Sequence, residues 1–577
     1  MMRFLCAAFF SAALAAQTPS PTPSPTPSPA PAGEEIATRE ETPVFQSQVN
    51  LVRVTVVVRD RDGKEVGNLK KEDFRLFDKG KPQVVAQFAM EGSAVPKPTP
   101  APSAEGEAPA PSEPGKPHVV LPTRFIAYVF DDWNLEAADL LLARQAATKH
   151  MQNVLRPEDR AAVFALSGHT ETPFTDDRAV LDAAMTKIRP LPRPQSNPPL
   201  SYFQSELIEQ YDDQDPNNEA LQVAAQEAVS CLSLTGSTAQ LGPEMARSAA
   251  RTTQQIGLQE TRNALLLLKA LASRMAAMPG DRIVIFISSG FYVANDLNTE
   301  MMQAIDRATR SNVVINTLDA RGVYVQPPVV DIPGCPMPPG NVQNKLFDYR
   351  GQEEAAKTIT LDQIADGTGG RAFRGSNDLL SGFNSLAAPP EYIYYLSFYP
   401  EDMKPDGSFH TLKVTLPNYK SLAVKARKGY WAPAHAEDEA AQATREIREA
   451  VFSRDEVHDL PVGVRTQFFK TSDEDAKLKV IAHLDLRAVR FHKEAEANRD
   501  DVTVVCALFD RNGNFVKGTQ KTVEMRVRDA TLQAHLRSGV DVGLEFDVKT
   551  GAYLIRLVVR DAGGHQLAAS NASAEIP

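Results

Sequence analysis

The chain has 577 residues, of which 42% are hydrophobic and 23% are charged, and its formal net charge is −11 at pH 7. This is the composition of a globular protein, and the length predicts more than one domain. Acidic residues are in excess and the basic runs are short, so nucleic acid and anionic lipid surfaces are disfavoured as partners.

The first seventeen residues, MMRFLCAAFFSAALAAQ, combine one arginine, a short apolar run and small residues near Ala13 to Ala16. This pattern is typical of a secretory signal peptide, which we assign to residues 1–16. We therefore expect a periplasmic or secreted protein. No later segment approaches the roughly 18 uninterrupted apolar residues of a membrane-spanning helix, so we predict no integral membrane span.

Two proline-rich segments, 17–43 and 92–120, are predicted to be an extended tether and a linker, because neither carries enough apolar side chains for a core. Between them, Val52, Val54, Val56 and Val58 alternate with Arg53, Thr55, Val57 and Arg59, which is the two-residue period of a strand. Turn sequences DRDG and DKGK interrupt this region. Residues 44–91 are thus predicted to form a small β module.

Residues 121–390 alternate strand-like runs with helix-like segments. The runs include RFIAYVFD, DRAAVFALS, DRIVIFISS and SNVVINTLDA. In the first helical segment Leu140, Ala143 and Ala147 recur at spacings of three and four, which gives one apolar face. Alternating strands and helices predict an α/β fold with a doubly wound, mostly parallel sheet. An insertion at about 190–250 is predicted to fold as helix and loop, and a long helix is predicted near 256–278.

The remainder is β-rich. Residues 391–433 are predicted to be strands, and they are a candidate partner for 44–91 in a single sandwich with the α/β domain inserted between them. Residues 434–458 resemble a linking helix. Residues 459–577 contain alternating strands with turns DRNG and DAGG, which predicts a C-terminal β-sandwich.

Three cysteines follow the signal. Cys231 and Cys335 lie in loop-like sequence, and an oxidising compartment favours a disulfide between them. Cys506 lies in the run VTVVCALF and is predicted to be a buried thiol. The chain has no CxxC or HxxxH pair, which argues against a cysteine or histidine metal site.

Two adjacent carboxylates follow the first predicted strand of the α/β region, in the stretch FDDWNLEAADL at 130 to 140. One interpretation is that Asp132 or Asn134 caps the following helix. Another is a cation site built on Asp131, Asp132, Asn134 and Glu136, because crowded carboxylates repel unless a cation lies among them. The third is an acid/base pair for hydrolysis. No GxSxG elbow or partner histidine accompanies it, so we expect no enzyme.

Several motifs occur together in one order: VTVVVRDRDGKEVGNLKKEDFRLFDKGKPQ, RFIAYVFDDWNL, LRPEDRAAVFALS, MPGDRIVIFISSGF, NVVINTLDARG, LDQIADGTGGRAF and YYLSFYPEDMKPDGSFHTLKVTL with RKGYWAP. This ordered set, over residues 45 to 433, resembles the VWFA-related domain family of acidobacterial envelope proteins. The resemblance implies a von Willebrand factor type A domain flanked by β modules, and a role in protein contact rather than catalysis. Residues 460 to 577 lie outside it.

Type A domains commonly bind a divalent cation through Asp-x-Ser-x-Ser, a threonine and a second aspartate, so the resemblance implies Mg²⁺ or Ca²⁺ as a candidate ligand. If Asp131 leads the motif here, Trp133 and Leu135 stand at the hydroxyl positions. If Asp132 leads, Asn134 and Glu136 stand there.

The other two loops depart from the family pattern further. Thr261 is the candidate second-loop ligand. The third loop reads Ser288-Ser289-Gly290, which makes Ser289 a candidate in place of an aspartate. The resemblance implies binding of another protein or an envelope polymer. The alternatives are a structural scaffold of the envelope and, third, a hydrolase.

Overall fold

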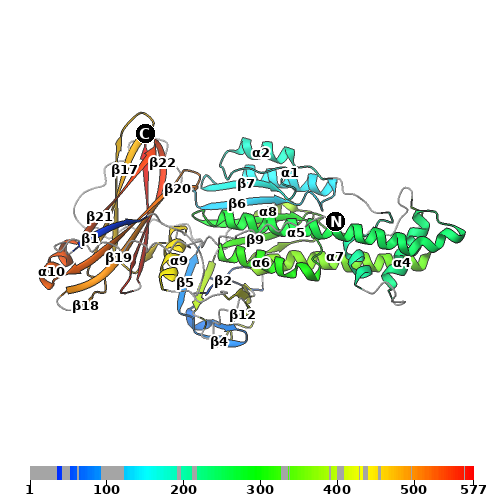
Figure 1. Cartoon of the computed structure of the whole chain (residues 1–577), viewed down its shortest axis with the longest axis horizontal. Coiled ribbons are helices and arrows are strands. Elements are labelled where there is room, and N and C mark those ends of the chain that lie inside the picture. The colour runs from blue at the N-terminus through cyan, green and yellow to red at the C-terminus, as the bar shows by residue number, and fades with distance from the viewer. Residues whose placement is uncertain are drawn as a thin grey trace, which may run out of the picture.

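The structure is a computed structural model. It describes residues 36–41, 52–61, 64–92, 122–191, 197–210, 218–325, 335–336, 338–388, 392–398, 400, 408–427, 429–432, 439–452, 456–494, 497–564 and 566–577. The predicted signal peptide and nearly all of the predicted linker 92–120 lie outside these residues. The molecule is elongated, with the α/β domain between a C-terminal β domain and a helical extension (Figure 1). No helix in the described ranges is long and apolar enough to cross a membrane.

The α/β domain is built on one parallel sheet of five strands: β6 (Arg124–Phe130), β7 (Asp159–Ala165), β8 (Asp281–Ser288), β9 (Val313–Asp319) and β10 (Ala372–Phe373). Their order is β10-β9-β8-β6-β7, and each neighbouring pair is parallel. Every residue of β6 and β7 is buried, because both faces of such a sheet are covered. The predicted mostly parallel sheet is confirmed.

Helices cover both faces of this sheet, three on each. On one face Ile126 and Tyr128 share a core with α1 (Ala137–Asn153), α2 (Arg178–Lys187) and α8 (Leu379–Ala387). On the other face Ala127 and Val129 pack with α5 (Gly242–Met275), α6 (Asn298–Arg310) and α7 (Gly340–Thr368). The even and odd residues of β6 thus enter two different cores, as the period of a strand requires.

The strand order reverses direction between β6 and β8. The chain passes from β6 to β7 on one side and then returns to place β8 on the other side of β6. In open α/β sheets the connections at such a point leave the sheet on opposite faces, so a crevice forms at the carboxyl ends of the two strands. This crevice is where a ligand site is expected.

The insertion forms a helical extension. Its elements are α3 (Tyr202–Glu209), α4 (Glu219–Cys231) and η2 (Gly236–Leu241), packed against α5 and α7. The helix predicted near 256–278 begins earlier, at Gly242, because its first turns bury Ala246 and Ala250 against α4 rather than the sheet. In the structure a disulfide joins Cys231 to Cys335, the pair that the sequence analysis proposed.

The β module is a sandwich made by two distant segments. The first supplies β2 (Val52–Arg59), η1 (Lys71–Asp73), β3 (Arg75–Asp78), β4 (Lys81–Gln83) and β5 (Gln87–Gly92). The second supplies β11 (Tyr392–Phe398), β12 (Phe409–Thr415), β13 (Ala423–Ala426) and β14 (Gly429–Trp431). The sheets are β13-β2-β11-β5 and β14-β12-β3-β4. The two segments that were candidate partners therefore pair, with the α/β domain inserted between them.

The C-terminal domain packs a seven-stranded sheet on a three-stranded one. Its elements are α9 (Glu439–Phe452), β15 (Val457–His458), β16 (Val462–Lys470), β17 (Asp475–Leu484), β18 (His492–Glu494), β19 (Ala497–Phe509), β20 (Phe515–Val527), α10 (Asp529–Ser538), β21 (Val540–Lys549), β22 (Gly551–Asp561) and β23 (Leu567–Ile576).

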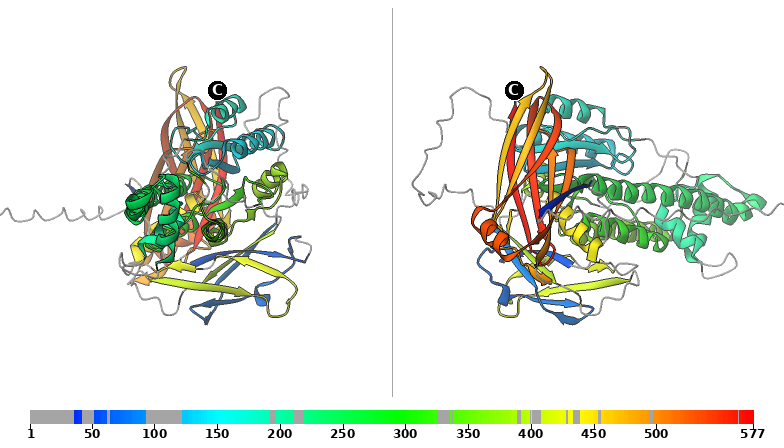
Figure 2. Two further views of the ribbon diagram at one scale, coloured as in Figure 1. Left: turned by 90° about the vertical axis from the view of Figure 1, so that its right-hand side faces the viewer. Right: turned by 60° about the vertical axis from the view of Figure 1, so that its left-hand side comes forward.

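Two segments of this domain differ from the prediction. Residues 36–41, assigned to the tether, form β1 (Ile36–Glu41), which pairs with β20 (Figure 2, dark blue). The segment 434–458 does more than link, since Val451 and Phe452 of α9 are buried against the large sheet.

Buried arginines connect the α/β domain to the C-terminal domain. Arg160 of β7 donates from Nη2 to the carbonyl of Arg511 at 2.8 Å, and Arg282 of β8 donates to the carbonyl of Phe452. Both side chains are almost fully buried. Because a buried guanidinium is costly without acceptors, these contacts favour a defined orientation of the two domains.

Candidate functional site

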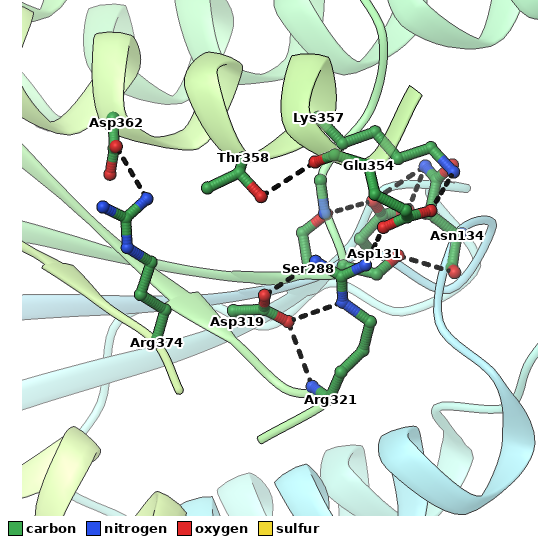
Figure 3. Close-up of polar contacts among 12 residues, drawn as sticks. Asp131, Asn134, Ser288, Asp319, Arg321, Glu354, Lys357, Thr358, Asp362 and Arg374 are labelled. Carbon is green, nitrogen blue, oxygen red and sulfur yellow. Dashed lines mark hydrogen bonds and ion pairs between the residues drawn. The ribbon is translucent and has the colours of Figure 1, made fainter. Parts of the chain in front are cut away.

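A polar cluster lies at the carboxyl ends of β6 and β8. Asp131 follows β6 and is fully buried. Its carboxylate accepts hydrogen bonds from the Ser288 hydroxyl at 2.6 Å, the Asn134 backbone N–H at 2.9 Å, and the Asn134 side-chain amide at 2.8 and 2.9 Å. Ser288 is the last residue of β8 and is also fully buried. The structure thus brings Asp131, Asn134 and Ser288 together at the strand-order reversal, as Figure 3 shows.

Asp132 serves a different loop. Its carboxylate accepts from the Ser167 hydroxyl at 2.5 Å and from the Ser167 N–H at 3.0 Å, and Ser167 follows β7. The adjacent aspartates therefore connect the loop after β6 to the loops after both neighbouring strands. Asp131 is thus bonded to the end of β8 and Asp132 to the loop after β7. Because the two carboxylates serve different neighbours, this geometry does not favour an acid/base pair for hydrolysis.

The predicted helix cap is wrong. Helix α1 begins at Ala137, its N-cap residue is Glu136, and no side chain caps it. Asp132 and Asn134 instead hold the loop that precedes the helix. The prediction failed because the chain adds a turn between strand and helix, in which Leu135 donates its N–H to the Asp131 carbonyl at 3.1 Å.

The remaining candidate ligands are near the cluster but point elsewhere. The Ser289 hydroxyl donates to the Asn134 carbonyl at 2.8 Å, so it fastens the loop after β6 to the loop after β8. The Thr261 hydroxyl donates to the Tyr292 carbonyl at 3.1 Å. Glu136 is exposed at the start of α1. Of the six residues predicted to hold a cation, only Asp131 and Asn134 bond to each other through their side chains.

A second charged cluster, which was not predicted from the sequence, lies at the end of β9. Asp319 ends this strand, and its carboxylate receives Arg321 through Nε at 2.9 Å and Nη2 at 2.7 Å. Arg321 also donates to Glu354 of α7. These partners raise the pKa of the Arg321 guanidinium against the opposing effect of its burial. The available signal was NTLDARG, in which one charge ends a buried strand and the other lies two residues further on.

Lysine 357 extends this cluster along α7. Its ammonium group lies 3.0 Å from Glu353 and 3.1 Å from Glu354. Burial acts to lower the pKa of Lys357, but the two carboxylates outweigh it, and the net pKa is raised. The ammonium group therefore stays protonated at neutral pH. The two basic side chains Arg321 and Lys357 thus pair with three carboxylates, those of Asp319, Glu353 and Glu354.

An exposed apolar segment follows this cluster directly. Val323, Tyr324 and Val325 are 58%, 42% and 79% exposed. The guanidinium carbon of Arg321 lies 4.6 Å from the centre of the Tyr324 ring, within the range of a cation–π contact. Exposed side chains of this size beside a rigid polar cluster are typical of a recognition surface.

The donor atoms fit a divalent cation poorly. Mg²⁺ and Ca²⁺ take six or more oxygen ligands, which are carboxylates, carbonyls and waters, and at least one carboxylate must be free to coordinate. At this edge both oxygens of Asp131 already accept hydrogen bonds, Oδ1 from the Asn134 backbone N–H and Oδ2 from the Ser288 hydroxyl, and Asp319 and Glu354 are paired with Arg321. In the described part of the chain, no group of three His, Cys, Asp or Glu side chains could hold a metal ion. At this edge of the sheet the positive charge comes from Arg321 and Lys357.

The sequence matches no family model and no curated protein. Among solved structures it is similar to a Bacteroides uniformis beta-glucuronidase, with 10% identity over 32% of this chain and 19% of that chain and a TM-score of 0.15. It is also similar to the pilus adhesin SpaC from Lactobacillus rhamnosus GG in its open conformation, with 7% identity over 79% of this chain and 44% of that chain and a TM-score of 0.22. The chain spans less than half the length of either protein, and similarity at these TM-scores informs neither fold nor function.

Proposed function

We propose that the inserted α/β domain is a von Willebrand factor type A domain that binds another protein or an envelope polymer outside the cytoplasm. The binding surface is the carboxyl edge of the parallel sheet, from the loop after β6 to the segment 323–325. The ordered motifs between residues 45 and 433 support the family assignment, and the amino-terminal sequence supports export.

One observation carries the binding proposal. At this edge a fully bonded polar cluster adjoins three consecutive exposed residues, Val323, Tyr324 and Val325. Exposed apolar side chains that are consecutive and adjoin a polar cluster are typical of a surface that a partner buries. Arg321 is already held by Asp319 and Glu354, so the Tyr324 ring is presented on a rigid support. Less conformational entropy is then lost on binding.

The partner contact we propose is cation-free. The partner would bury Tyr324 and the flanking valines and form hydrogen bonds at the rim of the Arg321 cluster. Tyrosine and arginine are the residue types that most often dominate binding energy at interfaces. The family's divalent-cation site stays a prediction. It requires Asp131 to exchange its hydrogen bonds with Asn134 and Ser288 for metal coordination.

Site-specific photo-crosslinking tests the surface. A benzophenone amino acid replaces Val325, and a matched control carries it at Val84, which is 76% exposed in the β module. We expect a discrete crosslinked product in envelope preparations from the first protein only, and we expect Tyr324→Ala to remove it while the protein remains folded. Equal products from both positions would contradict a specific surface.

Calorimetry decides between the cation-free and the cation-dependent forms. Mg²⁺, Mn²⁺ and Ca²⁺ are titrated into the wild type and into Asp131→Ala/Asp132→Ala. The cation-free form predicts no binding heat in either protein. Micromolar binding that is lost in the double variant would instead establish a functional cation site.

A scaffold is the second candidate, favoured by one observation. Arg160 and Arg282 fix the α/β domain on the C-terminal domain through buried contacts to backbone carbonyls, which suits a rigid spacer. A spacer needs no exposed apolar segment at the sheet edge. If Val323→Ser/Tyr324→Ser leaves every crosslink of the folded protein unchanged, the scaffold is the better account.

A further inference from the structure

The exposed segment 323–325 leaves the α/β domain at a fixed point. Gly322 has φ 70°, and a Cβ atom there would lie 2.2 Å from the side-chain oxygen of Asn377, so this turn requires glycine. The Val323 N–H donates to the same oxygen at 2.9 Å. Asn377 directly precedes the N-cap residue of α8, a helix whose Phe383 is fully buried. The start of the segment is therefore anchored to the domain core.

The charged side chains beside this segment have partners, with one exception. Four of them lie close enough to Tyr324 to affect the pKa of its hydroxyl: Glu354, Arg321, Lys357 and Arg350. The first three pair among themselves and with Asp319 and Glu353. The Arg350 side chain is partly exposed, and in the ranges that the structure describes it forms no hydrogen bond or ion pair. Arg350 is thus the uncommitted cation of this surface.

Contacts along α7 place Arg350 next to the segment. It lies one helical turn before Glu354, so the two side chains share a face of the helix. Glu354 binds Arg321, whose guanidinium carbon lies 4.6 Å from the centre of the Tyr324 ring. The other carboxylate that Arg350 influences is Glu227 of α4, but the two form no ion pair, and Oε2 of Glu227 has no hydrogen-bond partner among the described residues.

Exposed apolar side chains accompany this cation. Phe347 lies three residues before Arg350 on α7 and is 44% exposed, and Tyr324 and Val325 are the exposed residues described above. An arginine side chain forms two parallel hydrogen bonds with a carboxylate, and these bonds are stronger where apolar groups exclude water. The surface therefore fits a ligand that carries a carboxylate next to apolar groups.

A polypeptide meets this requirement better than a polysaccharide does. An acidic polysaccharide supplies carboxylates but few apolar groups, so it would leave Val323 and Val325 in contact with water. A polypeptide supplies both, because acidic and apolar side chains at alternate positions of an extended segment lie on the same side. The partner chemistry that fits is thus an acidic and apolar stretch of protein.

We propose that the sheet edge binds a segment of another protein in which an aspartate or glutamate stands beside apolar residues. The carboxylate pairs with Arg350, and the apolar side chains bury Tyr324, Val325 and Phe347. This inference rests on the proposed function and names the chemistry of the partner. Because the charge pair lies at the surface, its contribution to affinity decreases at high salt.

Selection from a displayed library of random dodecapeptides on the full-length mature protein supplies the probes. We expect the selected peptides to be enriched in aspartate and glutamate next to apolar residues. The strongest peptide is then synthesised together with a twin in which each acidic side chain is replaced by its amide. In calorimetry the wild type should bind the acidic peptide at least tenfold more tightly than the twin. Arg350→Gln should reduce this preference below threefold.

The controls separate the Arg350 contact from charge and folding effects. Arg374→Gln makes the same charge change at a surface arginine that pairs with Asp362, and it should keep the full preference (Figure 3). Arg350→Lys keeps the charge but loses the planar fork, and it should show an intermediate preference. Tyr324→Ala should weaken both peptides. Since the Arg350 side chain has no partner to lose, its variants should fold as the wild type does.

Three results would overturn the proposal. A selection that yields no binder, no excess of acidic residues or an excess of basic ones contradicts an acidic partner. Peptides that need Tyr324 but keep their carboxylate preference in Arg350→Gln contradict the role of Arg350 and leave the proposed surface intact. Peptides that bind Tyr324→Ala as tightly as the wild type contradict the proposed surface itself, and this inference with it.

Discussion

Replacement of Asp131 by alanine measures how much the buried cluster contributes to the α/β domain. The substitution leaves two buried donors without their acceptor, the Ser288 hydroxyl and the Asn134 backbone N–H, which now lie 2.6 and 2.9 Å from the carboxylate. The Asn134 side chain is only partly buried and can turn to water. Each stranded donor costs about 1–3 kcal/mol. Removal of a buried charge offsets part of this, and we expect a net loss of about 2–4 kcal/mol.

The assay follows unfolding of this domain through Trp133, which packs against the core beneath the cluster. The chain has two tryptophans, so a Trp431→Phe background isolates the Trp133 signal in a urea titration. Ser288→Ala is the graded control, because it removes one donor to Asp131 and the acceptor of the Gly290 N–H, and it should cost about 1–2 kcal/mol. A change below about 0.5 kcal/mol for Asp131→Ala would refute the structural role of the cluster.

Three further predictions concern other parts of the fold. Burial, and then the neighbouring Asp561, raises the pKa of Asp500 to about 8. The folded state thus keeps a proton that the unfolded state releases. The free energy of unfolding, measured by urea titration, should therefore decrease as the pH rises from about 4 to about 8, by at most about 1.4 kcal/mol per pH unit. Asp500→Asn should remove this pH dependence. Breaking the Cys231–Cys335 bridge, which spans 104 residues, should cost up to about 4–5 kcal/mol in the helical extension, measured as a reductant-dependent shift in melting temperature. Gly290 has φ 85° and lies against the α7 backbone, so Gly290→Ala should destabilise by more than about 1 kcal/mol in urea titrations, and an unchanged midpoint would contradict the close approach.

The parallel sheet was predictable because its strands are buried on both faces. Continuous apolar runs such as RFIAYVF have no other simple explanation when helical segments separate them. The same reasoning located Asp131 and the turn at Ser288, since residues that follow parallel strands lie at one edge, but the ligand it named in that turn was Ser289, whereas Ser288 contacts Asp131. The pairing of 44–91 with 391–433 was open in the sequence, because strand partners this far apart leave no local signal.

The two features that the sequence did not predict, β1 and the Arg321 cluster, both depend on contacts between residues far apart in the sequence. β1 was assigned to the tether because six residues with one strongly apolar side chain, Ile36, carry almost no periodic signal, and because its partner strand β20 lies far away in sequence, with Ile36 opposite Met525. The Arg321 cluster was missed because Glu354 comes from the middle of α7, and only the packed helix brings it to Asp319. Tertiary contacts decided both cases.

The affinity of the crosslinked partner for a variant of the exposed segment 323–325 tests the central claim most directly. The partner identified through Val325 is titrated against wild type, Val323→Ala/Tyr324→Ala and the control Val84→Ala. Burial of an exposed tyrosine and valine predicts at least a tenfold weaker dissociation constant for the double variant, and no change for the control. Equal affinity of all three proteins would show that the partner binds elsewhere and that the carboxyl edge of the sheet is not the recognition surface.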